Sequence, residues 1–217
     1  MGTAKKYRFE AIVTAVYLVF AAVYFIPSDV LNGFLPDSLV RFRIAYPVTI
    51  LALAAAYGGF KWTWVLAFVF SCTGDALGAY GSFIGQMSFF ALAHLMLISG
   101  FLLNGLKGST LWKTMVGVAV AAVLTVVFLL VIPCAPAGFL RIGCGIYAVL
   151  IAVMAGLSCM QHSRFFAFGA LLFLLSDSIL GWNKFVSPLP ASAWLIMVPY
   201  YLGQLLLWFG SNPPKRA

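Results

Sequence analysis

The chain alternates long apolar stretches with short polar connections, and this pattern predicts an all-α membrane protein. A helix needs about 20 apolar residues to cross a bilayer, and lipid accepts only segments whose backbone hydrogen bonds are satisfied internally. The pattern fits a bundle of eight transmembrane helices. We expect these spans near residues 10–27, 43–58, 62–80, 85–104, 113–132, 141–159, 165–186 and 192–210.

Composition supports this interpretation and excludes a soluble globular protein. Hydrophobic residues make up 64% of the 217 residues, charged residues make up 8%, and the mean hydropathy is +1.05. The longest connection, residues 28–42, is too short for a separate domain. We therefore expect a single integral membrane domain over residues 1–217. The first span lacks an A-x-A cleavage site, which favours a retained helix over a signal peptide.

The thirteen basic residues are scattered through the connections, so the net charge of +8 does not indicate nucleic-acid binding. With eight spans, nine of them fall on one side: Lys5, Lys6, Arg8, Lys61, Lys107, Lys113, Arg164, Lys215 and Arg216. The other side holds four: Arg41, Arg43, Arg141 and Lys184. The positive-inside rule then places both termini in the cytoplasm. We expect a multi-pass protein of a bacterial cell membrane.

Two acidic residues interrupt the apolar stretches, Asp75 in VFSCTGDALGAY and Asp177 in LFLLSDSILGWNK. A carboxylate at membrane depth is costly unless a partner, water or a function keeps it there. This pair is therefore the first functional-site hypothesis.

The two acidic segments are also similar to each other. Each contains an acid, a short small or apolar run, a glycine and an aromatic residue, and four predicted spans separate them. This favours two parallel four-helix halves. Chance similarity between glycine-rich apolar helices explains the same pattern equally well.

The predicted topology places several polar groups at one depth. Asp75 and Asp177 lie roughly 18 to 20 Å from the cytoplasmic side, at 1.5 Å per residue. His94 lies roughly 13 Å from the outer side, and Tyr200 and Tyr201 lie roughly 12 Å from it. We expect polar groups from four helices to converge in one layer.

Two carboxylates in an apolar pocket need not carry the same charge. A neutral aspartic acid can donate a proton while an anionic one activates water, so Asp75 and Asp177 are our catalytic candidates. The structural alternative is that each acid only ties its helix, through neighbouring hydroxyls such as Thr73, Ser176 and Ser178.

Six further residues are candidates for substrate binding: His94, Asn183, Lys184, Tyr200, Tyr201 and Gln204. A lone histidine on an apolar helix is also typical of a hydrogen-bonded core. Lys184 is placed to reach a lipid phosphate or to anchor the helix at the interface. Tyr200 and Gln204 form a polar stripe that suits either substrate contact or helix association.

Metal and cofactor chemistry is not indicated. With His94 and His162 as its two histidines, the chain cannot form a three-histidine zinc site, although a mixed site of His94 with the two aspartates stays open. We predict no metal and no cofactor. The sequence also lacks G-x-S-x-G, H-E-x-x-H, P-loop and Rossmann patterns, which argues against serine hydrolases and nucleotide enzymes.

The four cysteines have no metal-binding spacing and favour small packing residues. Cys134 and Cys144 fall at the outer ends of neighbouring spans, so a disulfide between them is open.

The segments FVFSCTGDALGAY, FFALAHLMLISGF, FGALLFLLSDSILGWNKF and YYLGQLLL, in this order, resemble the YhhN family over roughly residues 43–210. This family includes the lysoplasmalogenases of animal membranes. The resemblance implies an eight-span enzyme that hydrolyses the vinyl ether bond of lysoplasmalogens. The products would be a fatty aldehyde and glycerophospho-ethanolamine or -choline, with Asp75 and Asp177 carrying the activity.

One position departs from the family pattern. Family members often have a Lys-Pro pair early in the second span, where this sequence has Tyr46 and Pro47. If that lysine holds the substrate phosphate, Arg43 or Lys184 must replace it here.

The implied reaction needs only an acid and a base. Vinyl ethers hydrolyse when the carbon remote from oxygen is protonated and water captures the resulting oxocarbenium ion. One aspartic acid would give the proton and the other would stabilise the cation and deprotonate water. Apolar side chains would hold the alkenyl chain, among them Phe70, Phe89, Met154 and Phe173.

The expected partner is a lysophospholipid within the bilayer, and no protein partner is inferred. Two other classes of function remain open. A proton-coupled small transporter or lipid flippase would use the same aspartates to carry protons. A packing subunit would need them for folding alone.

Overall fold

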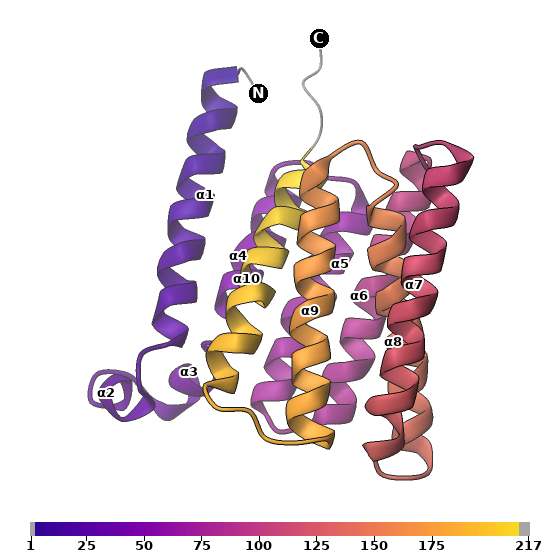
Figure 1. Cartoon of the computed structure of the whole chain (residues 1–217). Helices are drawn as coiled ribbons and strands as arrows, with labels where there is room; N and C mark the ends of the chain where they lie inside the picture. The colour runs from indigo at the N-terminus through magenta and orange to yellow at the C-terminus, as the bar shows by residue number, and fades with distance from the viewer. Residues whose placement is uncertain (1–2, 213–217) are drawn as a thin grey trace. The chain divides into compact units, whose positions relative to one another are not determined.

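The computed structural model describes residues 3–212, and the regular elements in this range are all helical (Figure 1). They are α1 (Thr3–Tyr24), α2 (Ser28–Asn32), α3 (Asp37–Phe42), α4 (Tyr46–Tyr57), α5 (Trp62–Ala79), α6 (Phe83–Asn104), α7 (Thr110–Leu130), η1 (Ile132–Cys134), α8 (Phe139–Ser158), α9 (Arg164–Phe185) and α10 (Ser192–Ser211). The eight predicted segments correspond to α1 and to α4 through α10. Lys215 and Arg216 lie outside the described residues.

Six of these helices are long and apolar enough to cross a membrane: α1, α6, α7, α8, α9 and α10. Helix α4 is apolar but has 12 residues, so it is about 18 Å long and shorter than a typical hydrocarbon core. Helix α5 has 18 residues and carries Asp75. The all-helical membrane character is therefore confirmed, whereas the count of eight spans stays a prediction.

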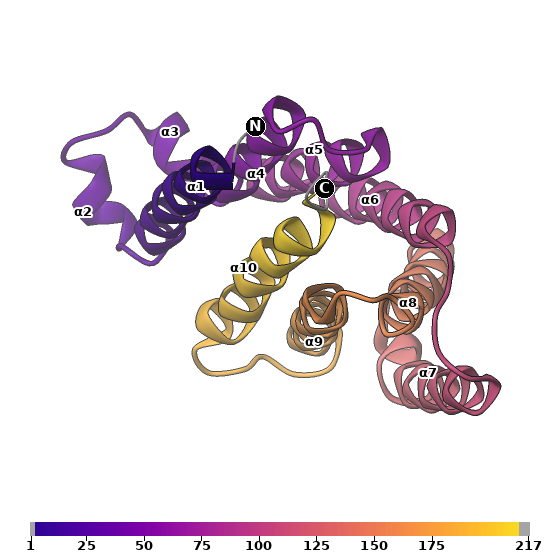
Figure 2. The same cartoon turned by 90° about the horizontal axis from the view of Figure 1, so that it is seen from above.

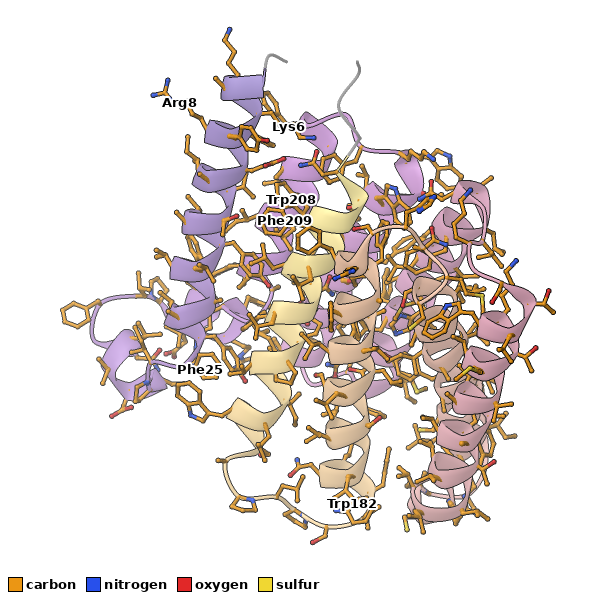
Figure 3. The ribbon with its side chains drawn as sticks, turned by 45° about the horizontal axis from the view of Figure 1, so that its top comes forward. Lys6, Arg8, Phe25, Trp182, Trp208 and Phe209 are labelled. Carbon is orange, nitrogen blue, oxygen red and sulfur yellow. The ribbon has the colours of Figure 1, made fainter. Side chains whose placement is uncertain are left out.

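Helix α1 begins earlier than its apolar pattern indicated. It continues through Lys5, Lys6 and Arg8, because backbone hydrogen bonding does not require apolar side chains. Figure 3 shows Lys6 and Arg8 near the start of α1 and Phe25 just after its other end. The apolar pattern marks the part of a helix that suits lipid, not the whole helix.

The chain forms two compact units, and the first consists of Met1–Ala93 with Ser211–Ala217. Within its described part, α1 packs on α4 and α4 packs on α5 (Figure 2). Helices α5 and α6 approach closely where Gly74 lies against Phe90, since a Cβ on Gly74 would lie 3.2 Å from the Phe90 ring. Small residues let helices pack at such short range without an aqueous hydrophobic effect.

The second unit is His94–Gly210. Here α7 runs beside α8 and α8 beside α9 (Figure 2). Helices α9 and α10 come into backbone contact at Gly169 and Gly203. A Cβ on Gly169 would lie 2.9 Å from the Gly203 carbonyl oxygen and from the Leu207 nitrogen, and a Cβ on Gly203 would lie 2.8 Å from the Gly169 oxygen. This contact fixes the two helices that carry most of the predicted polar residues.

In the second unit, the most apolar candidate span is the least buried. The most apolar candidate span contains α7 and buries 6% of its residues, whereas the least apolar, α10, buries 44%. Lipid is as apolar as leucine, so apolar faces can turn outward while small and polar residues pack inward. Helix α7 is therefore the helix of this unit best suited to face lipid.

All four cysteines lie within the described residues, and none of them forms a disulfide bond there. Cys134 is exposed and Cys144 is buried. The disulfide left open by the sequence is not formed, and Cys144 packs as a small apolar side chain.

Candidate functional site

Asp177 lies on α9, half-buried, and its Oδ2 atom accepts a hydrogen bond from the Tyr147 hydroxyl of α8. The serines beside it do not serve as donors to the acid. Ser176 donates to the Ile196 carbonyl (2.9 Å) and Ser178 to the Leu174 carbonyl (2.7 Å). A phenol from another helix, and not a neighbouring serine, therefore holds this carboxyl group.

Tyr147 also contacts His94 of α6, with 3.1 Å between the hydroxyl oxygen and Nε2. His94 is fully buried, and its Nδ1 atom has no hydrogen-bond partner among the described residues. Sequence reasoning missed Tyr147, which is one of nine tyrosines and carries no local signal. It joins two predicted residues that are distant in sequence.

Aromatic contacts connect this polar group to α10. The Phe173 ring lies edge-on to His94 at 4.9 Å and to Tyr200 at 5.3 Å between ring centroids. Tyr200 stacks obliquely on Tyr201 and accepts a hydrogen bond of 3.3 Å from Gln204 Nε2. Five predicted residues of the second unit thus form one buried or half-buried cluster: His94, Asp177, Tyr200, Tyr201 and Gln204. Met154 is also fully buried in this unit.

Asp75 lies on α5 in the first unit and is 1% exposed. It is close enough to Tyr17, Tyr24 and Cys72 to interact with them electrostatically. The hydroxyl of Thr73 donates to the Val69 carbonyl at 2.8 Å. Because Asp75 and Asp177 belong to different units, the shared site stays a prediction.

Asn183 and Lys184 lie near the end of α9, next to Trp182, which Figure 3 shows at that end. The Asn183 side-chain oxygen accepts the backbone N–H of Leu189 at 2.8 Å, so it fixes the connection to α10. The Lys184 side chain is exposed. These two residues lie apart from the buried cluster along the helix.

The Arg43 side chain forms its hydrogen bonds within the first unit, mostly with backbone carbonyls. Its guanidinium donates to the carbonyls of Tyr24 (3.2 Å), Val40 (2.9 Å) and Ile26 (3.4 Å), and to the Ser28 hydroxyl (3.1 Å). These bonds tie the end of α1 to the segment of α2 and α3. Of the two cations considered for a substrate phosphate, Lys184 is therefore the better candidate.

The family model described as YhhN family matches residues 38–211. The chain belongs to the YhhN family. Among curated relatives, lysoplasmalogenase TMEM86B of Homo sapiens is 30% identical over 202 residues, covering 88% of this chain and 82% of the relative. Lysoplasmalogenase TMEM86A of Homo sapiens is 32% identical over 152 residues, covering 64% of this chain and 60% of the relative. The rat TMEM86B lysoplasmalogenase is 30% identical over 199 residues.

No solved structure matches this chain with significance. The family match and the six long apolar helices together identify this YhhN protein as a multi-pass integral membrane protein.

Proposed function

We propose that this chain is a membrane hydrolase of the lysoplasmalogenase type. It cleaves the vinyl ether bond of a lysoplasmalogen to a fatty aldehyde and a glycerophospho-ethanolamine or -choline. The observation that carries the proposal is the similarity to relatives named lysoplasmalogenase, one of which is matched over 82% of its length. The family match over residues 38–211 supports it.

Asp75 and Asp177 are the proposed acid and base. Each sits in an otherwise apolar helix, where an ionisable group is expensive and functional by default. The alternative that neighbouring hydroxyls tie these acids is weakened, because Thr73, Ser176 and Ser178 all donate to backbone carbonyls. Protonation of the remote vinyl carbon and capture by water would each gain about 10²- to 10⁴-fold from such groups.

The substrate would lie along the residues of the second unit. His94, Tyr200, Tyr201 and Gln204 would line the reacting part of the lipid. Phe173 and Met154, both fully buried, would contact its alkenyl chain. Asn183 and the exposed Lys184 would meet the glycerophosphate.

The membrane arrangement belongs to the same proposal. Helices α4 and α5 would complete a bundle of eight spans in a single integral domain, with two parallel four-helix halves. Both termini would face the cytoplasm of a bacterial cell membrane. The distribution of basic residues between the connections supports this orientation.

The test is aldehyde release by the purified protein in lipid vesicles that contain lysoplasmenylethanolamine or lysoplasmenylcholine. The matched control substrate is the saturated 1-alkyl ether, which has no double bond to protonate. We expect aldehyde from the vinyl ethers and none from the control. Absence of aldehyde from both vinyl ethers would refute the proposal, and proton-driven movement of intact lipid would favour a transporter instead.

A further inference from the structure

Two connections of the second unit lie side by side at one end of its helices, the one between α6 and α7 and the one between α8 and α9 (Figure 2). The Lys107 backbone N–H donates to the Met160 carbonyl at 2.7 Å. The Trp112 indole N–H donates to the Cys159 carbonyl at 3.2 Å, although 47 sequence positions separate these residues. The two connections are therefore joined by direct hydrogen bonds.

Further contacts hold this end of the second unit together. The Gln161 side-chain nitrogen donates to the carbonyls of Phe101 (3.3 Å) and Leu157 (3.4 Å), which lie near the ends of α6 and α8. Gly108 has a φ of 99°, and a Cβ there would lie 2.5 Å from the Trp112 ring. The first connection therefore passes directly over the indole, and the ends of α6, α7 and α8 are fixed to one another.

Three cations lie beside these hydrogen bonds: Lys107 in the first connection, Lys113 in the first turn of α7 and Arg164 at the start of α9. All three are exposed, and we call them the basic junction. Asp177 is the single acid among residues 94–210, all of which the structure describes. It lies about 20 Å from Arg164 along α9. The basic junction therefore has no acidic partner within its own unit.

Exposed apolar side chains directly adjoin the cations. Leu111 is 70% exposed, Trp112 is 44% exposed and Phe165 is 50% exposed. They lie at the beginning of α7 and α9, two helices that are long and apolar enough to cross a membrane. Cations next to a tryptophan at the end of an apolar span are typical of the headgroup level of a bilayer.

We propose that the basic junction binds the headgroup of an anionic phospholipid. The phosphate would lie among Lys107, Lys113 and Arg164, and the acyl chains would run along Leu111 and Phe165. The uncompensated positive charge favours an anionic lipid over a zwitterionic one, and the adjoining apolar side chains favour a lipid over a soluble phosphate. The proposal goes beyond the hydrolase function and does not depend on it.

A bound lipid would have a structural effect on α7. The span that contains this helix buries 6% of its residues, so few internal contacts hold it in place. A headgroup shared by Lys113 of α7 and Arg164 of α9 would connect the start of α7 to a second helix. Anionic lipid should therefore stabilise the folded protein more than zwitterionic lipid does.

The first test measures the lipid preference next to Trp112. The protein is placed in phosphatidylcholine vesicles with a small fraction of either phosphatidylglycerol or phosphatidylcholine that carries brominated acyl chains. Subtracting the emission of a Trp112→Phe variant gives the quenching of Trp112 alone. We expect an apparent preference of about 5-fold or more for phosphatidylglycerol. Equal quenching by the two brominated lipids would overturn the proposal.

Two sets of substitutions test the role of the three cations. The triple variant Lys107→Gln, Lys113→Gln, Arg164→Gln should lower the preference to less than about 2-fold, because the attraction to the phosphate is lost. The set Lys107→Arg, Lys113→Arg, Arg164→Lys keeps every charge and should retain the preference. A preference that persists in the glutamine variant, or an equal loss in both sets, would contradict the proposal.

The matched control removes the same number and kind of charges from the first unit. Lys5, Arg8 and Lys61 are exposed there, and their replacement by glutamine should leave the preference at Trp112 unchanged. An equal fall in this variant would mean that total charge attracts the lipid, and the basic junction would not be a binding site.

A soluble phosphate ester tests whether the ligand is a lipid. Glycerol 3-phosphate in excess carries the phosphate without acyl chains, and we expect it to leave the quenching by brominated phosphatidylglycerol unchanged. A fall to the phosphatidylcholine level would assign the basic junction to soluble phosphates and overturn the lipid proposal.

Thermal melting in a neutral detergent gives an independent measurement. Added phosphatidylglycerol should raise Tm by about 2 to 4 °C more than phosphatidylcholine does, and the glutamine triple variant should lose this difference. The same Tm with both lipids in the unsubstituted protein would contradict a lipid that holds α7. These measurements use no lysoplasmalogen, so their failure is distinct from failure of the hydrolase function.

Discussion

The segments around Asp75 and Asp177 are alike in sequence but differ in their surroundings. Asp75 is almost fully buried in the first unit, with Tyr17, Tyr24 and Cys72 within electrostatic reach. Asp177 is half-buried in the second unit and is held by Tyr147. Similar strings therefore place similar acids, but the neighbouring helices decide what each acid can do.

The glycines that follow the two acids differ in the same way. A Cβ on Gly78 would lie 2.7 Å from the Gln86 side chain, so this glycine admits a polar side chain from α6. A Cβ on Gly181 would lie 3.5 Å from Val131, which is an ordinary contact. The shared acid and glycine pattern does not require a shared structural role.

The largest expected effect comes from removing either acid. Asp75→Asn and Asp177→Asn keep the side-chain shape and should each lower aldehyde release by about 10²-fold or more, because a proton donor or acceptor is lost. Steady-state assays of the purified variants in vesicles measure this loss, and thermal melting checks their folding. Near-normal activity in both variants would refute the hypothesis that Asp75 and Asp177 act as the catalytic acid and base.

A double variant tests whether Asp75 and Asp177 contribute to the same catalytic step. If they do, Asp75→Asn combined with Asp177→Asn should be within about 10-fold of the worse single variant, since groups that act as a unit are not additive. The same aldehyde assay gives the answer. If the loss of activity in the double variant equals the product of the two single-variant losses, the two acids contribute independently.

A stability comparison tests whether the close contact between α9 and α10 stabilises the folded protein. Gly169→Ala should destabilise the protein by about 1 to 3 kcal/mol, because the new Cβ meets backbone atoms of α10 at 2.9 Å. Denaturant unfolding in detergent measures the change.

The matched control for that comparison is Gly181→Ala on the same helix. The space around Gly181 and the higher helix propensity of alanine should leave stability unchanged or raise it by up to about 1 kcal/mol. Equal melting of the two variants would mean that the close approach of α9 and α10 does not control stability.

The smallest expected effect concerns the exposed end of the Asp177 helix. Lys184→Gln should raise KM about 2- to 5-fold with kcat unchanged, because an exposed charge contributes little to binding a phosphate. Lys61→Gln, another exposed lysine, is the control for a general loss of positive charge. An equal rise of KM in both variants would remove Lys184 from the site.

Most helix positions follow from the apolar pattern. The prediction of 192–210 compares with Ser192–Ser211 in the structure, and 165–186 with Arg164–Phe185. The first segment is the least well predicted, since 10–27 becomes Thr3–Tyr24. The second segment, 43–58, becomes Tyr46–Tyr57, with Pro47 in its first turn. Proline is tolerated there because the first N–H groups of a helix have no intrahelical partner.

The candidate site is less predictable than the helices. Asp75, His94 and Asp177 are visible in the sequence because a polar group in an apolar stretch is conspicuous. Tyr147 is not, since it is one of nine tyrosines in the chain and its contacts lie 53 and 30 residues away. The serines next to Asp177 suggested hydrogen bonds to its carboxyl group that the structure does not contain, because residues adjacent in sequence on a helix point in different directions.

The outward-facing apolar surface of α7 has a practical consequence for handling this protein. With 6% of the residues in its span covered by the rest of the chain, nearly all of that surface must be covered by something else. The surrounding amphiphile therefore acts as a structural component, comparable to a missing subunit. Acyl-chain length and bilayer thickness should govern how well this region survives purification, even where every internal contact is intact.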